Sequence, residues 1–164
     1  MNIFEVTLVV SALLCSLVAG FLFAYAIVIM PGIKNLDDKQ FIKAFQITDR
    51  VIQNNQPVFI FVWLGSALSL ILCAFTGLVK LQGLDFSMLL LATIGYLVGV
   101  QVSTIAIHLP LNRRLQGYDI EAMTDEELSE ARIGFEPVWN RSNERRAIIA
   151  CVASLLLIVL ALRI

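Results

Sequence analysis

Residues 3–30 have the sequence IFEVTLVVSALLCSLVAGFLFAYAIVIM, an apolar run long enough to cross the hydrocarbon core of a bilayer as a helix. The run is too long for the apolar core of a signal peptide, no basic residue precedes it, and it carries Glu5 near its start. We therefore expect a retained transmembrane helix. Similar apolar runs cover residues 57–79, 86–109 and 147–162. The sequence thus predicts an all-α membrane protein, a bundle of four transmembrane helices in a single domain over residues 1–164.

The composition indicates the same fold class. Hydrophobic residues make up 59% of the chain, charged residues only 15%, and the mean hydropathy is +0.83. Soluble domains contain about 25% charged residues, so the lipid bilayer is the expected surrounding of this chain. A formal net charge of −1 offers no basic surface for nucleic acid. The cysteines lie inside apolar runs without CxxC spacing, which indicates packing residues rather than a zinc site or disulfides. They are Cys15, Cys73 and Cys151.

Basic residues are distributed unequally between the two sides of the predicted bundle. The chain has 12 Lys and Arg residues, and all of them except Lys80 and Arg163 fall within residues 31–56 and 110–146. Basic residues near the ends of spans resist translocation across the membrane. We therefore expect the two long segments in the cytoplasm and both termini outside, in the inner membrane of a bacterium.

Small residues recur at every fourth position in three of the spans, a pattern that lets membrane helices approach closely. The sets are Ala12, Ser16, Gly20 and Ala24; Gly65, Ser69, Cys73 and Gly77; and Gly95, Gly99 and Ser103. We expect these positions to face neighbouring helices. The alternative is that Gly and small residues are simply frequent in membrane helices.

Residues 37–56, between the first two spans, have the pattern of an amphipathic helix at the membrane interface. Its apolar residues at helical spacing are Phe41, Phe45 and Ile52. A polar stripe of Gln46, Asp49 and Gln53 flanks this apolar face, and Asn54 stands at the end of the helix. The stripe either lines a pocket or is the solvated flank of a surface helix.

The segment before the fourth span contains a second helix signal. Thr124 and Glu127 have the spacing of a capping box, which predicts a short helix over residues 125–133 that ends at Gly134. Its acidic residues indicate a solvated face, because no His or second carboxylate motif stands at metal-ligand spacing. They are Glu121, Asp125, Glu126, Glu127 and Glu130. Pro137 suits the first turn of a helix, so we expect the last helix to begin there.

Trp139, Asn143 and Arg146 stand at positions i, i+4 and i+7 of this last helix and share one face. The same face continues to the small residues Ala150 and Ser154, so we expect it to look into the bundle. The alternative is an interfacial Trp beside an Arg that reaches toward the membrane surface.

The third span brings further polar residues to the same end of the bundle. It ends in His108-Leu-Pro-Leu-Asn112, which contains the only histidine of the chain. Histidine can exchange a proton near neutral pH, although at a helix end it often serves only as a hydrogen-bonding residue. The candidate site is therefore a ring of polar residues at one end of an apolar bundle. Its members are Gln46, Asn54, His108, Asn112, Trp139, Asn143 and Arg146.

Several motifs together resemble those of the anthrone oxygenase-like family of small membrane proteins. They are Pro31 after a span with Gly20, Tyr25 and Met30, Ala44-Phe-Gln46, Asn54-Asn-Gln-Pro57-Val-Phe59, His108-Leu-Pro-Leu-Asn112 and Trp139-xxx-Asn143-xx-Arg146. The resemblance covers nearly the whole chain, and the motifs at the third and fourth spans are the specific part. Family members are expected to have Gln and then Asn three residues later in the interfacial helix, where this chain has Gln46 and Asp49.

The resemblance implies a function. Characterised members of the family oxidise polyketide anthrones to anthraquinones with molecular oxygen and without a metal, flavin or haem. By this resemblance His108 would be the base, Trp139 the wall on which the ring stacks, and Arg146 the partner of the substrate anion. The residues expected to bind and orient the substrate are Gln46, Asp49, Asn54, Asn112 and Asn143.

Three hypotheses about function remain open at this point. The first is a cofactor-independent monooxygenase that takes a hydrophobic aromatic substrate. The second is a non-catalytic membrane protein that binds a lipid or hydrophobic metabolite, or acts as a partner subunit, and in which the polar ring is a structural latch. The third is a metal or haem protein; we expect no metal or cofactor, while ligation of haem or a metal through His108 stays open. A homo-oligomer is also left open.

Overall fold

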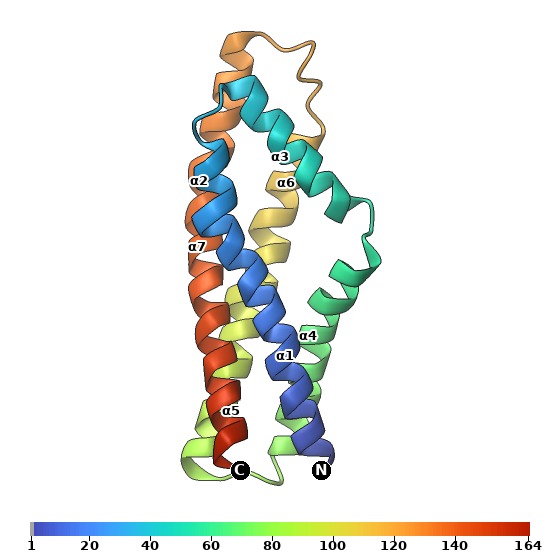
Figure 1. Ribbon diagram of the computed structural model, residues 1–164, viewed down its shortest axis with the longest axis vertical. Helices are drawn as coiled ribbons and strands as arrows, with labels where there is room; N and C mark the ends of the chain where they lie inside the picture. Colours follow the sequence, from blue (N-terminus) through green and yellow to red (C-terminus); the bar gives the residue numbers. More distant parts are fainter. Residues whose placement is uncertain (1) are drawn as a thin grey trace.

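The computed structural model describes residues 2–164, and within them the chain is helical with no strand (Figure 1). Four long helical stretches are each long and apolar enough to cross a membrane. The first consists of α1 (Ile3–Ala24), η1 (Tyr25–Ile29) and α2 (Met30–Ile33), and the second is α4 (Pro57–Gly77). The third consists of α5 (Gly83–Tyr96), η2 (Leu97–Val102), η3 (Thr104–His108) and α6 (Leu109–Gln116), and the fourth is α7 (Asp125–Arg163). The predicted all-α, four-span fold class is confirmed.

The amphipathic helix predicted between the first two spans is α3 (Asp38–Gln53), which lies across one end of the bundle (Figure 1). Asp37 caps it, because its Oδ1 accepts a hydrogen bond from the backbone nitrogen of Gln40 over 2.7 Å. Phe41 and Phe45 are fully buried in a cluster with Phe135 of α7. The apolar face of α3 therefore packs against protein. Both chain termini lie at the opposite end of the bundle (Figure 1).

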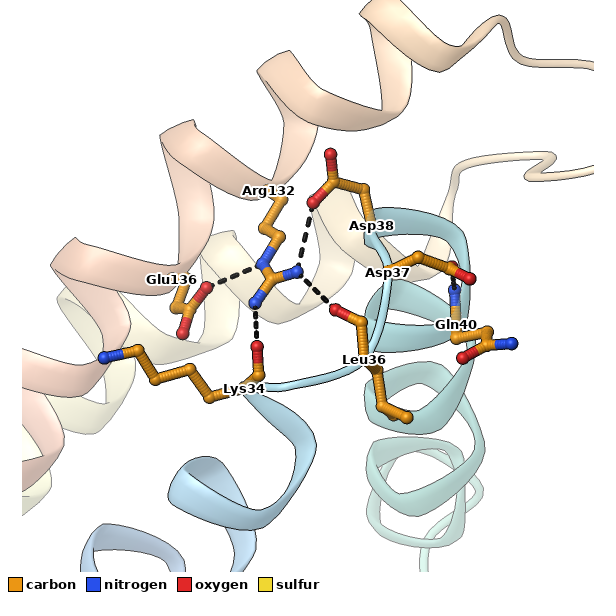
Figure 2. Close-up of polar contacts among 7 residues, drawn as sticks. All are labelled: Lys34, Leu36, Asp37, Asp38, Gln40, Arg132 and Glu136. Carbon is orange, nitrogen blue, oxygen red and sulfur yellow. Dashed lines mark hydrogen bonds and ion pairs between the residues drawn. The ribbon is translucent and has the colours of Figure 1, made fainter.

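Arg132 of α7 fastens the connection between α2 and α3, as Figure 2 shows. Its guanidinium donates to the backbone carbonyl oxygens of Lys34 over 2.7 Å and Leu36 over 2.9 Å. It also pairs with Oδ1 of Asp38 over 3.0 Å and with Oε2 of Glu136 over 2.7 Å. Because charged donors form strong hydrogen bonds, this one side chain holds the start of α3 against α7.

The helix α7 corrects two predictions about its boundaries. The predicted capping box at Thr124 is present: Oγ1 of Thr124 accepts from the backbone nitrogen of Glu127, and Oε2 of Glu127 accepts from that of Thr124 over 2.8 Å. However, the helix does not end at Gly134, and Pro137 lies inside it rather than at its start. The predicted short helix before the fourth span is therefore the first part of α7.

Packing explains why these two breakers do not interrupt the helix. Gly134 and Pro137 are both exposed, so water can reach the carbonyl that the proline leaves without its helical partner. Phe135, between the two breakers, and Trp139, just after Pro137, are buried against α3 and hold the helical backbone in place. Tertiary contacts thus override local stop signals.

Small residues mark close helix approaches, although not at every predicted position. A Cβ atom on Gly99 would lie 2.6 Å from Cδ1 of Ile149 on α7, so this glycine permits the contact between the third and fourth spans. Gly20 is exposed with no other atom within 4 Å of a Cβ, which contradicts its predicted role. The small residues that α1 buries are Ser11, Ala12, Cys15 and Ala19.

Candidate functional site

A cavity of about 430 Å³ lies among α1, α3, α4, α7 and the stretch from η2 to α6. Most of its wall is apolar or aromatic. The aromatic lining residues are Phe21, Tyr25, Phe45, Phe59, Trp63 and Trp139. Polar lining residues include Asp49, Gln53, Thr104, His108, Asn112 and Arg146. A cavity of this size with a few polar groups in an apolar wall is typical of small-molecule sites.

Four of the lining residues stand on π-helical turns, and one of them is Val100 in η2. Tyr25 begins η1, and Thr104 and His108 begin and end η3. Both η1 and η3 are followed within two residues by a proline, Pro31 or Pro110, whose ring conflicts with regular α-helical bonding to the preceding turn. A π turn moves side chains around the helix axis and recurs at functional sites.

Arg146 is the centre of a hydrogen-bond network on the cavity wall. Its Nη2 donates to Nδ1 of His108 over 3.1 Å and to Oδ1 of Asn143 over 2.8 Å, and its Nη1 donates to Oγ1 of Thr104 over 2.9 Å. Because a guanidinium has only donors, Nδ1 of His108 carries no hydrogen. The ring hydrogen is therefore on Nε2, which donates to Oγ of Ser142 over 2.8 Å. Both nitrogens of a neutral His108 are engaged.

The charge of Arg146 has no carboxylate partner within residues 2–164. The residue is 5% exposed, and its Nε has no hydrogen-bond partner. A buried cation surrounded by neutral groups is costly, and in membrane helices such residues are usually functional. Since Arg146 lines the cavity, an anionic oxygen bound there could supply the missing partner.

A second chain of hydrogen bonds joins three elements around the cavity. Nε1 of Trp139 on α7 donates to Oδ1 of Asn112 on α6 over 3.0 Å, and Nδ2 of Asn112 donates to Oδ1 of Asp49 on α3 over 2.7 Å. The Trp139 ring also lies edge-on to the His108 ring, with centroids 5.1 Å apart. The predicted inward face of α7 is confirmed: its residues are buried, and Trp139 contacts Asn112 of α6 directly and Asp49 of α3 through that amide.

Asp49 is a buried carboxylate on the cavity wall, with 2% of its surface exposed. Its Oδ2 accepts from Nε2 of Gln116 over 3.2 Å and from Nε2 of Gln53 over 3.3 Å. Burial raises the pKa of Asp49 above its ordinary value, and the hydrogen bonds from Gln116, Gln53 and Asn112 offset part of that rise.

The family model for anthrone oxygenase matches residues 46–156, which is more than half of the 164-residue chain. The chain belongs to the anthrone oxygenase family. The matched segment runs from α3 into α7 and includes Asp49, His108 and Arg146. Neither the curated proteins nor the solved structures contain a match to the chain.

Not every residue predicted for the site of this anthrone oxygenase family member lines the cavity. Gln46 is buried, but its Nε2 donates to the carbonyl oxygens of Leu115 over 2.8 Å and Tyr118 over 3.1 Å, so it ties α3 to the end of α6. Asn54 is exposed at the end of α3. Asn143 lies behind Arg146 and orients it.

The acidic residues around the start of α7 are exposed, as predicted for a solvated face. Nowhere between residues 2 and 164 do three or more His, Cys, Asp or Glu side chains converge so that they could hold a metal ion.

The hydroxyl residues of the network were not among the residues predicted from the sequence. Thr104 accepts from Arg146, and Ser142 accepts from His108 and lies 3.3 Å from the hydroxyl of Ser103. Single Ser and Thr residues in apolar helices usually bond their own backbone, so their type and spacing carry no signal of a site. The one hint in the sequence for Thr104 is Pro110, which disturbs the helical turns before it.

Proposed function

We propose that the protein oxidises a hydroxylated, anthrone-like phenol with molecular oxygen in the cavity beside Arg146, without a bound metal, flavin or haem. The supporting observation is the buried guanidinium of Arg146, without a carboxylate partner in residues 2–164, on the wall of an aromatic-lined cavity. A flat aromatic ligand that becomes an anion on losing a proton matches both the wall and the charge. Membership of the anthrone oxygenase family supports the same substrate class.

The proposed reaction needs only the substrate, oxygen and a base. Loss of a proton from the ring methylene gives an enolate whose negative charge is shared with the oxygen across the ring. Molecular oxygen then forms a C–O bond at the former methylene carbon, and the proton returns to the resulting peroxide. The O–O bond and the second C–H bond break with release of water, which leaves the quinone carbonyl. One oxygen atom enters the product and the other leaves as water.

The residues of the cavity have separate roles in this proposal. Arg146 stabilises the enolate oxygen, and Trp139 contacts the substrate ring. His108, the base suggested by the family resemblance, keeps its Nδ1 on Arg146 and so positions the guanidinium. Asn143 supports Arg146 from the other side, and Asn112 links Trp139 to Asp49.

Oxygen-18 labelling tests the proposal. Protein in lipid nanodiscs is given a hydroxyanthrone under ¹⁸O₂, and the product is analysed by mass spectrometry. The proposal predicts an anthraquinone that carries one labelled oxygen, formed faster than in empty nanodiscs. Arg146→Met should lower the rate by about 100-fold, a loss typical of removing one donor to a developing oxyanion. The matched control is Arg145→Met at the neighbouring, exposed arginine, which should keep the rate.

A chelator should leave this rate unchanged. The proposal is contradicted by a wild-type protein that binds the anthrone but leaves its oxidation at the spontaneous rate. That outcome would favour the alternative in which the cavity holds a hydrophobic molecule without catalysis.

A further inference from the structure

We infer that Asp49 is the base that removes the methylene proton of the substrate, an inference that rests on the proposed function. The substrate C–H bond breaks, its proton goes to a carboxylate oxygen of Asp49, and the electron pair stays on the substrate as the enolate. The same carboxyl then returns the proton to the peroxide. Asp49 is thereby restored to its ionised starting state within one turnover.

The other titratable groups on the cavity wall are less suited to take a proton. His108 has no free lone pair, because Nδ1 accepts from Arg146 and the Nε2 hydrogen points to Ser142. A proton placed on His108 would also put two positive charges at hydrogen-bond distance. Tyr25 is a phenol, a group that keeps its proton at neutral pH. Asp49 is the one carboxylate among the residues that line the cavity.

The partners of Asp49 orient it without neutralising it. Three side-chain amides donate to the carboxylate, from Asn112 over 2.7 Å, Gln116 over 3.2 Å and Gln53 over 3.3 Å. No ion pair involves Asp49 in the part of the chain that the structure describes. A carboxylate held by neutral donors is a stronger base than one paired with a cation.

The orientation of Asn112 couples this carboxylate to the aromatic wall. The indole nitrogen of Trp139 can only donate, so Oδ1 of Asn112 must face it, and Nδ2 is then directed at Asp49. The residue proposed to contact the substrate ring thus also determines, through one amide, where the carboxylate oxygen lies.

The electrostatic setting suits proton transfer. The charged and titratable groups that share the cavity with Asp49 are Tyr25, His108 and Arg146. Burial raises the pKa of Asp49 and brings it closer to neutral pH, where a general base is most effective. Arg146 on the wall is free to meet the enolate charge that forms when Asp49 becomes neutral.

The test compares Asp49→Asn, which retains an acceptor oxygen but cannot take a proton, with the wild type and with Glu126→Gln, an exposed control. We expect Asp49→Asn to lower kcat by about 100-fold or more while the product anthraquinone, which has no methylene proton, binds within about threefold of wild type. Wild-type kcat/KM should rise with pH as Asp49 ionises and then level off. This acid limb should be absent from the residual activity of Asp49→Asn.

Each outcome decides something different. If the wild type turns over and Asp49→Asn keeps both the rate and the acid limb, the role of Asp49 is overturned. The proposed function then still stands. A wild-type protein without turnover overturns both. Should Asp49→Asn not fold, Asp49→Glu carries the test: activity with a displaced acid limb supports the inference, and an acid limb identical to that of wild type contradicts it.

Discussion

Arg146 and His108 fix each other's state: Nη2 of Arg146 donates to Nδ1 of His108 over 3.1 Å, which keeps that ring nitrogen free of hydrogen and directs Nε2 at Ser142. The guanidinium in turn has an imidazole as a neutral acceptor in place of a carboxylate. Its positive charge therefore remains available to the cavity that both residues line.

His108→Ala separates a positioning role from a structural latch. Arg146 retains Asn143 and Thr104 as acceptors in this variant, so we expect the melting temperature in detergent to change little. Turnover of a hydroxyanthrone should fall by about 100-fold, because a guanidinium that has lost one of its three partners is less precisely oriented toward the substrate oxygen. A latch would give the reverse, a loss of about 1–3 kcal/mol of stability with no effect specific to turnover.

Asp49 should make the stability of the protein depend on pH. Because burial raises its pKa in the folded state, the folded protein holds this proton to higher pH than the unfolded chain does. The free energy of unfolding should therefore fall as the pH rises from about 4 through the raised pKa, and then level off. Thermal melts should show this decline in wild type and in the exposed control Glu126→Gln, and not in Asp49→Asn. A decline of equal size in all three would show that another group is responsible.

Arg132→Met should loosen α3 from the bundle. The variant loses donors to two backbone carbonyls and to Asp38 and Glu136, a loss that we expect to cost about 1–3 kcal/mol (Figure 2). Hydrogen exchange should rise first in α3, whose start Arg132 holds. Arg141→Met, at an exposed position of the same helix, is the control. Unchanged exchange in α3 would mean that the buried phenylalanines alone hold this helix.

The third and fourth spans should separate when Gly99 is enlarged. Gly99→Leu would force its side chain into Ile149, and we expect a loss of about 1–3 kcal/mol. Gly20→Leu is the matched control, since nothing lies within 4 Å of a Cβ there. Equal melting temperatures for the two variants would place Gly99 against lipid.

Periodicity was enough to predict the spans, α3 and the inward face of α7. Trp139, Asn143 and Arg146 repeat at helical spacing, and their face continues to the small residues Ala150 and Ser154, which suit the inside of a bundle. The boundaries inside α7 could not be predicted in this way. Gly134 and Pro137 are local stop signals, and whether they act depends on the burial of Phe135 and Trp139 against α3.

The hydrogen-bond partners of the site residues could also not be predicted from the sequence. The amide of Gln46 and that of Asn112 look alike in the sequence, yet one binds backbone carbonyls at the end of α6 and the other bridges Trp139 to Asp49. This difference depends on where α6 ends relative to α3. The contacts of Arg132 could not be predicted for the same reason. Two of its acceptors are the backbone carbonyls of Lys34 and Leu36, which no side-chain type marks in the sequence.

The central claim is that Arg146 holds an anionic oxygen of an aromatic ligand. A hydroxyanthraquinone tests this claim directly, because the absorption of the ligand moves to longer wavelength when its hydroxyl ionises. The measurement is a pH titration of the ligand bound in nanodiscs that contain wild type or Arg146→Gln. We predict that the hydroxyl pKa of the ligand bound to wild type is about one to three pH units lower than that of the ligand bound to the variant. Equal values, with the ligand bound to both proteins, would contradict the account.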